Sequence, residues 1–103
     1  DRFFARLLDE ADLTRTAVLY TSDHGQNFEP DALTHCSVED PDPREAIVPL
    51  LVATDDEALR PRFAAAAALG GGRSHFSIAP TILELFGYRS EDIAQAQGAS
   101  LLA

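Results

Sequence analysis

The sequence predicts an α/β protein, in which helix-like and strand-like segments alternate along 103 residues. Two hydrophobic runs rich in strand-forming residues, at about 16–22 and 47–53, predict buried strands. Apolar residues at helical spacing over 2–11 and an alanine-rich stretch at 62–69 predict helices. This alternation is typical of helices layered on a sheet.

Local signals give the ends of these elements. Asp55 and Asp56 are expected at the entry to the alanine-rich helix, with Pro61 near its first turn. Pro49 is expected at the start of the second strand, where a missing backbone N–H does least harm. Gly70, Gly71 and Gly72 end the alanine-rich helix, and Ser74 is a candidate N-cap for the next turn. Pro80 is predicted to open a helix that runs to Phe86 and ends at Gly87.

The remaining stretches are less regular. Ser90 is predicted to start a last short helix, and residues 98–102 are a weak strand or a docking segment. Residues 25–46 lack periodicity and hold three prolines with many acids, which is typical of a functional or disordered loop. The acids at 39–45 are interpreted as a solvated loop face. We find no internal repeat and treat residues 1–103 as one segment of a single domain.

Charge and cysteine content argue against several classes of protein and of binding site. The net charge of −9, without any lysine, disfavours binding to nucleic acid. The single cysteine, Cys36, excludes a disulfide framework within the chain and a cysteine-rich zinc knuckle. The chain begins at Asp1 with no signal peptide or membrane-spanning run in view, so we expect an excised or cleaved segment.

The stretch AVLYTSDHG at residues 17–25 ends a hydrophobic run in Asp23, His24 and Gly25. A carboxylate oxygen and an imidazole nitrogen together suit one divalent metal ion. Because neighbouring side chains on a strand point to opposite faces, both reach one ion only where the strand has ended and the backbone bends, and Gly25 permits that bend. Since zinc sites usually have at least three protein ligands, the chain is predicted to carry part of a metal site.

Four stretches, in order, resemble the sulfatase-like branch of the alkaline phosphatase superfamily, which includes sulfatases and phosphoethanolamine transferases. They are YTSDHG at 20–25, VPLLV at 48–52, SHFSIAPTILELFGY at 74–88 and GASLL at 98–102. The first looks like the second metal-binding motif of that branch. Two residues depart from the pattern, because Gln26 stands where Glu is common and Ser77 where Asp is common.

The resemblance implies that the chain is the C-terminal part of an alkaline-phosphatase-like three-layer sandwich, with two or three strands and flanking helices. The intact protein would be a metal-dependent hydrolase or transferase acting on phosphate or sulfate esters. Asp23 and His24 would be metal ligands, and His35 a substrate contact. The nucleophile would lie upstream. Cys36 lacks the Pro and Arg that follow a sulfatase nucleophile cysteine, so the segment alone is expected to be inactive.

The same resemblance bears on the metal and on partners. Zinc is favoured because it suits an imidazole nitrogen, with calcium and manganese as alternatives. The partners would be the ester substrate and the N-terminal part of the same domain. Without that part, exposed apolar surface favours self-association. A parent enzyme acting on envelope lipids or polysaccharides would be periplasmic or membrane-anchored, although this segment itself does not indicate a compartment.

Other interpretations stay open at this point. Asp23 and His24 could form a strand-end turn with a capping Asp, and His35 could be a solvated loop residue. For His75, capping or packing at a helix start is favoured over catalysis. The chain could also belong to a non-catalytic binding or assembly module, or to a phosphodiesterase or phosphoglycerate mutase relative in the same superfamily.

Overall fold

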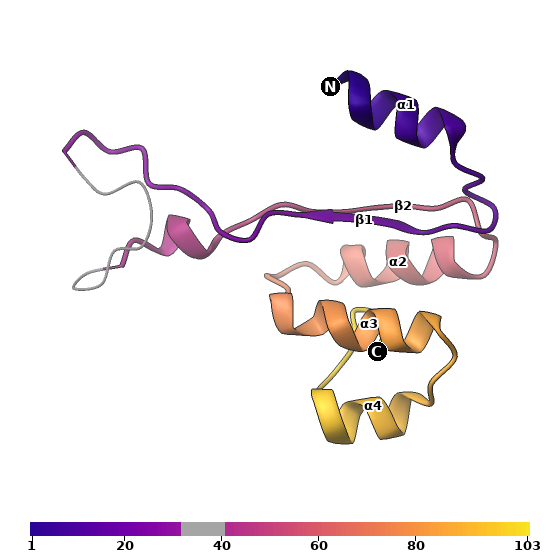
Figure 1. The fold of residues 1–103 in the computed structure, drawn as a ribbon. Coiled ribbons are helices and arrows are strands. Elements are labelled where there is room, and N and C mark those ends of the chain that lie inside the picture. Colours follow the sequence, from indigo (N-terminus) through magenta and orange to yellow (C-terminus); the bar gives the residue numbers. More distant parts are fainter. Residues whose placement is uncertain (32–40) are drawn as a thin grey trace. The chain divides into compact units, whose positions relative to one another are not determined.

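A two-stranded antiparallel sheet and several helices make up the part of the chain that the computed structural model describes, residues 1–31 and 41–103 (Figure 1). This confirms the predicted α/β class. The chain divides into two units, residues 1–55 and 56–103, and each is described by itself. Within the described residues, no helix has the length and apolar character that crossing a membrane requires.

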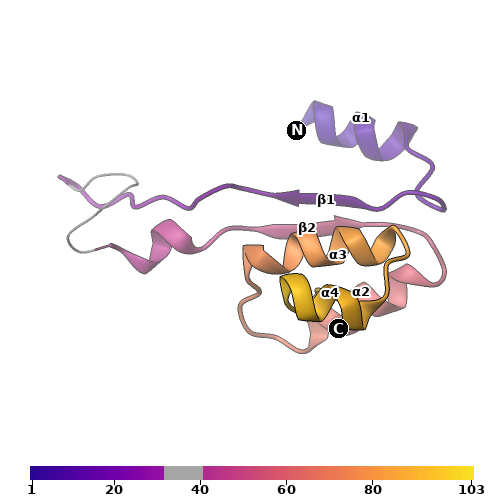
Figure 2. The ribbon, with the colours of Figure 1, turned by 60° about the horizontal axis from the view of Figure 1, so that its bottom comes forward.

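The sheet of the first unit consists of β1 (Val18–Thr21) and β2 (Leu50–Ala53), and both were predicted from hydrophobic runs. The prediction that they are buried is wrong for this chain, because the residues of both strands are half-buried or exposed. The two strands pair antiparallel (Figures 1 and 2). Pro49 immediately precedes β2, as predicted, so it removes no hydrogen bond from the ladder. Because Thr21 pairs with Leu50, β1 ends and β2 begins at the same end of the sheet.

The first unit begins with α1 (Arg2–Glu10), the amphipathic helix predicted at residues 2–11. Asp1 caps it, because its side chain accepts a hydrogen bond from the backbone N of Phe3 at 2.8 Å. The ring of Phe4 packs edge-on against Tyr20 of β1, with centroids 4.8 Å apart. This contact joins the helix to the first strand.

The second unit begins with α2 (Leu59–Ala68), which includes residues before the alanine-rich stretch predicted at 62–69. Asp56 lies at the helix entry, as predicted, and its Oδ1 accepts hydrogen bonds from the backbone N of Ala58 and of Leu59, both at 2.9 Å. These bonds satisfy N–H groups that a helix start leaves without partners. The capping carboxylate of Asp56 therefore marks the start of α2.

A short 3₁₀ turn, η2 (His75–Ser77), leads into α3 (Ile78–Leu85). Ser74 caps η2 as predicted, since its hydroxyl accepts a backbone N–H bond at 3.2 Å. Pro80 is the third residue of α3 rather than the first. Its missing N–H is tolerated there because the first-turn N–H groups have no helical partner. Gly87, with φ of +88°, follows the end of α3, as predicted.

The last helix, α4 (Ser90–Gln97), begins at the predicted Ser90 and buries Ile93. The tail that follows forms a turn and not a strand, so the docking alternative for residues 98–102 is the correct one. Thr81 of α3 is fully buried, and its hydroxyl accepts a hydrogen bond from the backbone N of Leu101 at 2.8 Å. The tail is therefore anchored on α3.

Candidate metal centre

Asp23 and His24 lie just beyond the end of β1, where the strand stops at Thr21. Both side chains are exposed, Asp23 at 88% and His24 at 43%. The Nε2 atom of His24 lies 3.9 Å from Oδ1 of Asp23. The two neighbouring side chains thus lie on the same side of the chain, which a continuing strand would prevent.

Local hydrogen bonds orient the imidazole. Nδ1 of His24 lies 2.7 Å from the carbonyl oxygen of Gly25, which can only accept, so Nδ1 carries the proton in this contact. In the neutral ring Nε2 is then the nitrogen that is available to a metal. The hydroxyl of Ser22 donates to the carbonyl oxygen of His24 at 2.8 Å and supports the same turn.

The carboxylate of Asp23 is kept in its charged form. The neighbouring His24 lowers the pKa of Asp23 below its ordinary value, chiefly through its charge and further through hydrogen bonds from backbone N–H groups. One of these comes from the backbone N of His24 to Oδ1, at 3.0 Å. An anionic oxygen is the protonation state that metal binding requires of a carboxylate ligand.

The two donor atoms lie near the separation that one ion requires. Zinc lies about 2.0–2.2 Å from a carboxylate oxygen or an imidazole nitrogen, so two donors of a tetrahedral site are about 3.4 Å apart. The 3.9 Å between Nε2 and Oδ1 is slightly wider, and a small side-chain movement would bring both atoms to one ion. Within residues 1–31 and 41–103, no group of three or more His, Cys, Asp or Glu side chains is gathered. The pair would therefore need ligands from elsewhere.

Gly25 has a different role from the predicted one. Its φ is not in the left-handed region, so the turn itself does not demand glycine. Instead, a Cβ atom at this position would lie 2.1 Å from the carbonyl oxygen of Arg44 and 2.5 Å from that of Ile47. The backbone N of Gly25 also donates to the carbonyl oxygen of Glu45 at 2.7 Å. Gly25 is needed because backbone packs directly on backbone.

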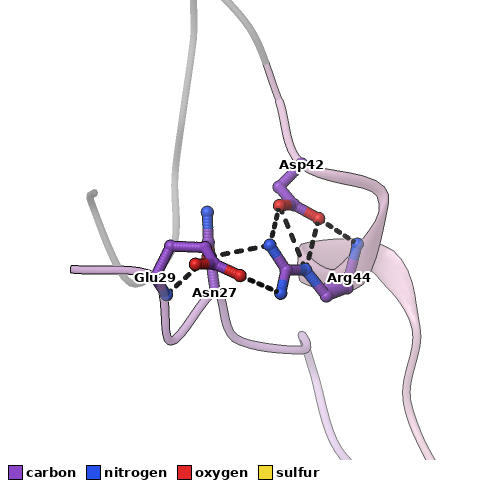
Figure 3. Close-up of polar contacts among 4 residues, drawn as sticks. All are labelled: Asn27, Glu29, Asp42 and Arg44. Atoms are coloured by element: carbon purple, nitrogen blue, oxygen red, sulfur yellow. Dashed lines mark hydrogen bonds and ion pairs between the residues drawn. The ribbon is translucent and has the colours of Figure 1, made fainter. Parts of the chain in front are cut away.

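Gly25 contacts η1 (Pro43–Ala46), a short 3₁₀ turn that precedes β2 in the chain. Figure 3 shows the guanidinium of Arg44 among Asn27, Glu29 and Asp42. Arg44 contacts Asp42 Oδ2 at 2.6 Å, Glu29 Oε1 at 2.9 Å and Asn27 Oδ1 at 3.3 Å. We call these four residues the Arg44 cluster.

The Arg44 cluster was not predicted. Of the acids at 39–45, residues 39 and 40 lie outside the described residues, and Asp42 is half-buried and paired with Arg44 as well as partly solvated. Hydrogen bonds from Arg44 lower the pKa of Asp42 to about 2. Asn27 is 7% exposed, and its Oδ1 also accepts a hydrogen bond from the backbone N of Glu29 at 2.9 Å. In the sequence, the only indication of the Arg44 cluster was one arginine among many acidic residues.

His24 also lines a shallow hollow of about 410 Å³. Tyr20, Ile47 and Pro49 give it an apolar side, and Gln26 is among its polar lining residues. The hollow is open to solvent, with the candidate ligand His24 in its wall.

Other predicted positions are placed as follows. His35 and Cys36 lie outside the described residues, so the proposed substrate contact stays a prediction. His75 is exposed and is the first residue of η2, directly after the cap Ser74. It belongs to the second unit, and we assign it no chemistry.

Comparison with known proteins identifies the family to which the chain belongs. A protein-family model described as Sulfatase matches residues 1–88. Neither the curated proteins nor the solved structures gave a match. The chain belongs to the sulfatase family, and membership of this family supports a hydrolase activity for the intact protein. Its α/β architecture is consistent with part of an alkaline-phosphatase-like domain.

Proposed function

We propose that the chain supplies two ligands, Asp23 and His24, to the metal centre of a sulfatase-like enzyme that acts on phosphate or sulfate esters. The observation that carries this proposal is the 3.9 Å separation between Nε2 of His24 and Oδ1 of Asp23 at the end of β1. Family membership supports it, because the match includes both residues. The acceptor of the transferred group, water or an alcohol, distinguishes a hydrolase from a phosphoethanolamine-transferase-like enzyme.

A divalent ion, zinc in preference to calcium or manganese, would stabilise negative charge on the ester oxygens and lower the pKa of a bound hydroxyl. Two residues of this chain would hold the ion. Asp23 contributes an anionic oxygen. The carbonyl oxygen of Gly25 keeps the proton of His24 on Nδ1 and leaves Nε2 to act as the ligand. The hollow beside His24 offers space for a group of the ester.

Two further roles belong to the same proposal. His35 would donate a hydrogen bond to a nonbridging oxygen of the ester. The nucleophile and the remaining ligands would come from outside this chain, and the other part of the domain would be its structural partner. The intact enzyme would work in the periplasm or at a membrane.

The proposal is tested on the full-length protein by metal analysis and by turnover of a sulfate monoester and a phosphodiester. Asp23→Ala and His24→Ala are each expected to lose bound metal and activity. Asp9→Ala and His75→Ala are matched controls, because they remove the same side chains from positions outside the site, and both should retain metal. Unchanged metal content in Asp23→Ala and His24→Ala would remove the assignment.

A further inference from the structure

The guanidinium of Arg44 holds together two separate stretches of the first unit. Its Nη1 lies 2.9 Å from Oε1 of Glu29, and its Nη2 lies 3.3 Å from Oδ1 of the buried Asn27. On its own stretch, Nε lies 3.0 and 3.1 Å from the two carboxylate oxygens of Asp42 (Figure 3). Such forked contacts fix both distance and orientation.

The stretch that Arg44 holds is directly continuous with the candidate ligands. Asn27 follows His24 by three residues, with Gly25 between them. Gly25 is also held on η1, because its backbone N donates a hydrogen bond to the carbonyl oxygen of Glu45 at 2.7 Å. The carbonyl oxygen of Gly25 in turn lies 2.7 Å from Nδ1 of His24. Arg44 is thus connected to the imidazole through one short run of backbone.

The charges around Arg44 argue against direct binding of an anionic substrate. Two carboxylates, Glu29 and Asp42, already face its guanidinium. Hydrogen bonds from Arg44 lower the pKa of Asp42 to about 2, so that this carboxylate is ionised at neutral pH. A cation neutralised in this way has little net attraction for a phosphate or sulfate group.

We propose that Arg44 is a positioning residue for the metal centre, which holds the backbone after His24 so that Nε2 of His24 and Oδ1 of Asp23 face the same ion. This inference rests on the proposed function of Asp23 and His24. It adds a residue that acts through the Arg44 cluster and Gly25 and does not contact metal or substrate. Removing a direct partner of a metal ligand typically weakens metal binding about 10–100-fold. Arg44 acts one step further from the ligands, so we expect a loss of up to about tenfold.

The test measures zinc affinity by competition with a chelator, on the full-length protein. Arg44→Gln is expected to weaken zinc binding several-fold, up to about tenfold. Arg44→Lys should fall between it and the native protein, because an ammonium offers charge without the planar fork. Arg62→Gln is the matched control, since it removes another arginine ion pair, with Glu84, that lies in the second unit, and it should bind zinc normally.

The outcomes separate this inference from the function on which it rests. Native zinc affinity in a folded Arg44→Gln protein would overturn the role of Arg44, while loss of metal in Asp23→Ala would still support the site. Retained metal in both Asp23→Ala and His24→Ala would overturn the proposed function itself. If Arg44→Gln does not fold, Glu29→Gln removes one ion pair only and should still weaken zinc binding. Native affinity in Glu29→Gln would then count against the inference.

Discussion

The backbone of Gly25 lies so close to Arg44 that a Cβ atom on Gly25 would be only 2.1 Å from the carbonyl oxygen of Arg44. This contact joins the turn that carries Asp23 and His24 to η1, the segment that leads into β2. The candidate ligands are therefore positioned from two sides, by the end of β1 and by η1. The predictions below follow from these contacts and from the anchoring of the C-terminal tail.

Gly25→Ala is predicted to displace the turn. The added methyl group meets backbone carbonyl oxygens at 2.1 and 2.5 Å, and neither can rotate away as a side chain would. Overpacking of this kind costs about 1–3 kcal/mol, and we expect the upper end because backbone has to move. Denaturant unfolding measures the cost, with Gly72→Ala as the control, since nothing lies within 4 Å of a Cβ atom there. Equal stability of the two variants would contradict the close packing of Gly25.

Asn27→Ala is predicted to loosen the stretch after the candidate ligands. It removes the acceptor for the backbone N of Glu29 and for Arg44, and the loss of a typical hydrogen bond costs about 0.5–1.5 kcal/mol. Asn27→Asp keeps an oxygen acceptor at the same place and should behave much more like the native chain. Amide hydrogen exchange at Glu29 is the measurement. Equally fast exchange in Asn27→Asp and Asn27→Ala would show that the acceptor is not what matters.

Thr81→Val is predicted to release the C-terminal tail from α3. Valine has nearly the same shape but makes neither the hydrogen bond to the carbonyl oxygen of Ser77, at 2.6 Å, nor the one from the backbone N of Leu101, at 2.8 Å. The second loss leaves a buried N–H unsatisfied, so we expect about 1–3 kcal/mol of destabilisation. Thr81→Ser keeps the hydroxyl and serves as the control. Unchanged protection of the Leu101 amide in Thr81→Val would argue against this anchor.

The stability of the second unit is predicted to fall in acid partly because of Glu84. The hydroxyl of Ser100, and then the guanidinium of Arg62, lower the pKa of Glu84 below its ordinary value. A carboxyl with a lowered folded-state pKa stabilises the fold fully above its unfolded-state pKa, about 4.3. That contribution is lost as the pH falls through the lower folded-state value. Glu84→Gln should flatten this part of the pH profile, and Ser100→Ala should flatten it less.

The outcome of the Glu84 prediction is read from free energies of unfolding measured between neutral pH and acid. A Glu84→Gln profile parallel to the native one below the ordinary glutamate pKa would contradict the interaction of Glu84 with Ser100 and Arg62.

Much of the fold was predictable because local signals and burial agree. The hydrophobic runs placed β1 and β2, and the helical spacing of Phe3, Phe4 and Leu7 placed α1. Ser74 and Gly87 act as the cap and the end signal that their residue types indicate. The positions of Asp23 and His24 after a strand end were also predicted, because a hydrophobic run and a polar turn differ sharply in composition.

The Arg44 cluster could not be predicted, because it depends on tertiary contacts. Arg44 lies 15 residues from Glu29 and 17 from Asn27, across a stretch without periodicity. An arginine among many acids is compatible with solvent exposure as well as with pairing. The demand for glycine at position 25 is similar, since it comes from carbonyl oxygens of Arg44 and Ile47 about twenty residues further along the chain.

For the C-terminal tail, the local sequence pattern was compatible with two structures, and only tertiary packing distinguishes them. Residues 98–102 were compatible with a weak strand or a docking segment. The buried hydroxyl of Thr81, which accepts from the backbone N of Leu101, favours docking because it satisfies a polar group that a free end would leave to solvent. Leu101 is 4% exposed as a result.

One ion is predicted to lie between Asp23 and His24, and anomalous diffraction at the zinc absorption edge can locate it. In crystals of the full-length protein grown with zinc, we expect an anomalous peak about 2.0–2.2 Å from both Nε2 of His24 and a carboxylate oxygen of Asp23. The peak should be absent from crystals of His24→Ala. A zinc peak bound to neither side chain, or one that persists unchanged in His24→Ala, would show that these residues do not form the metal centre.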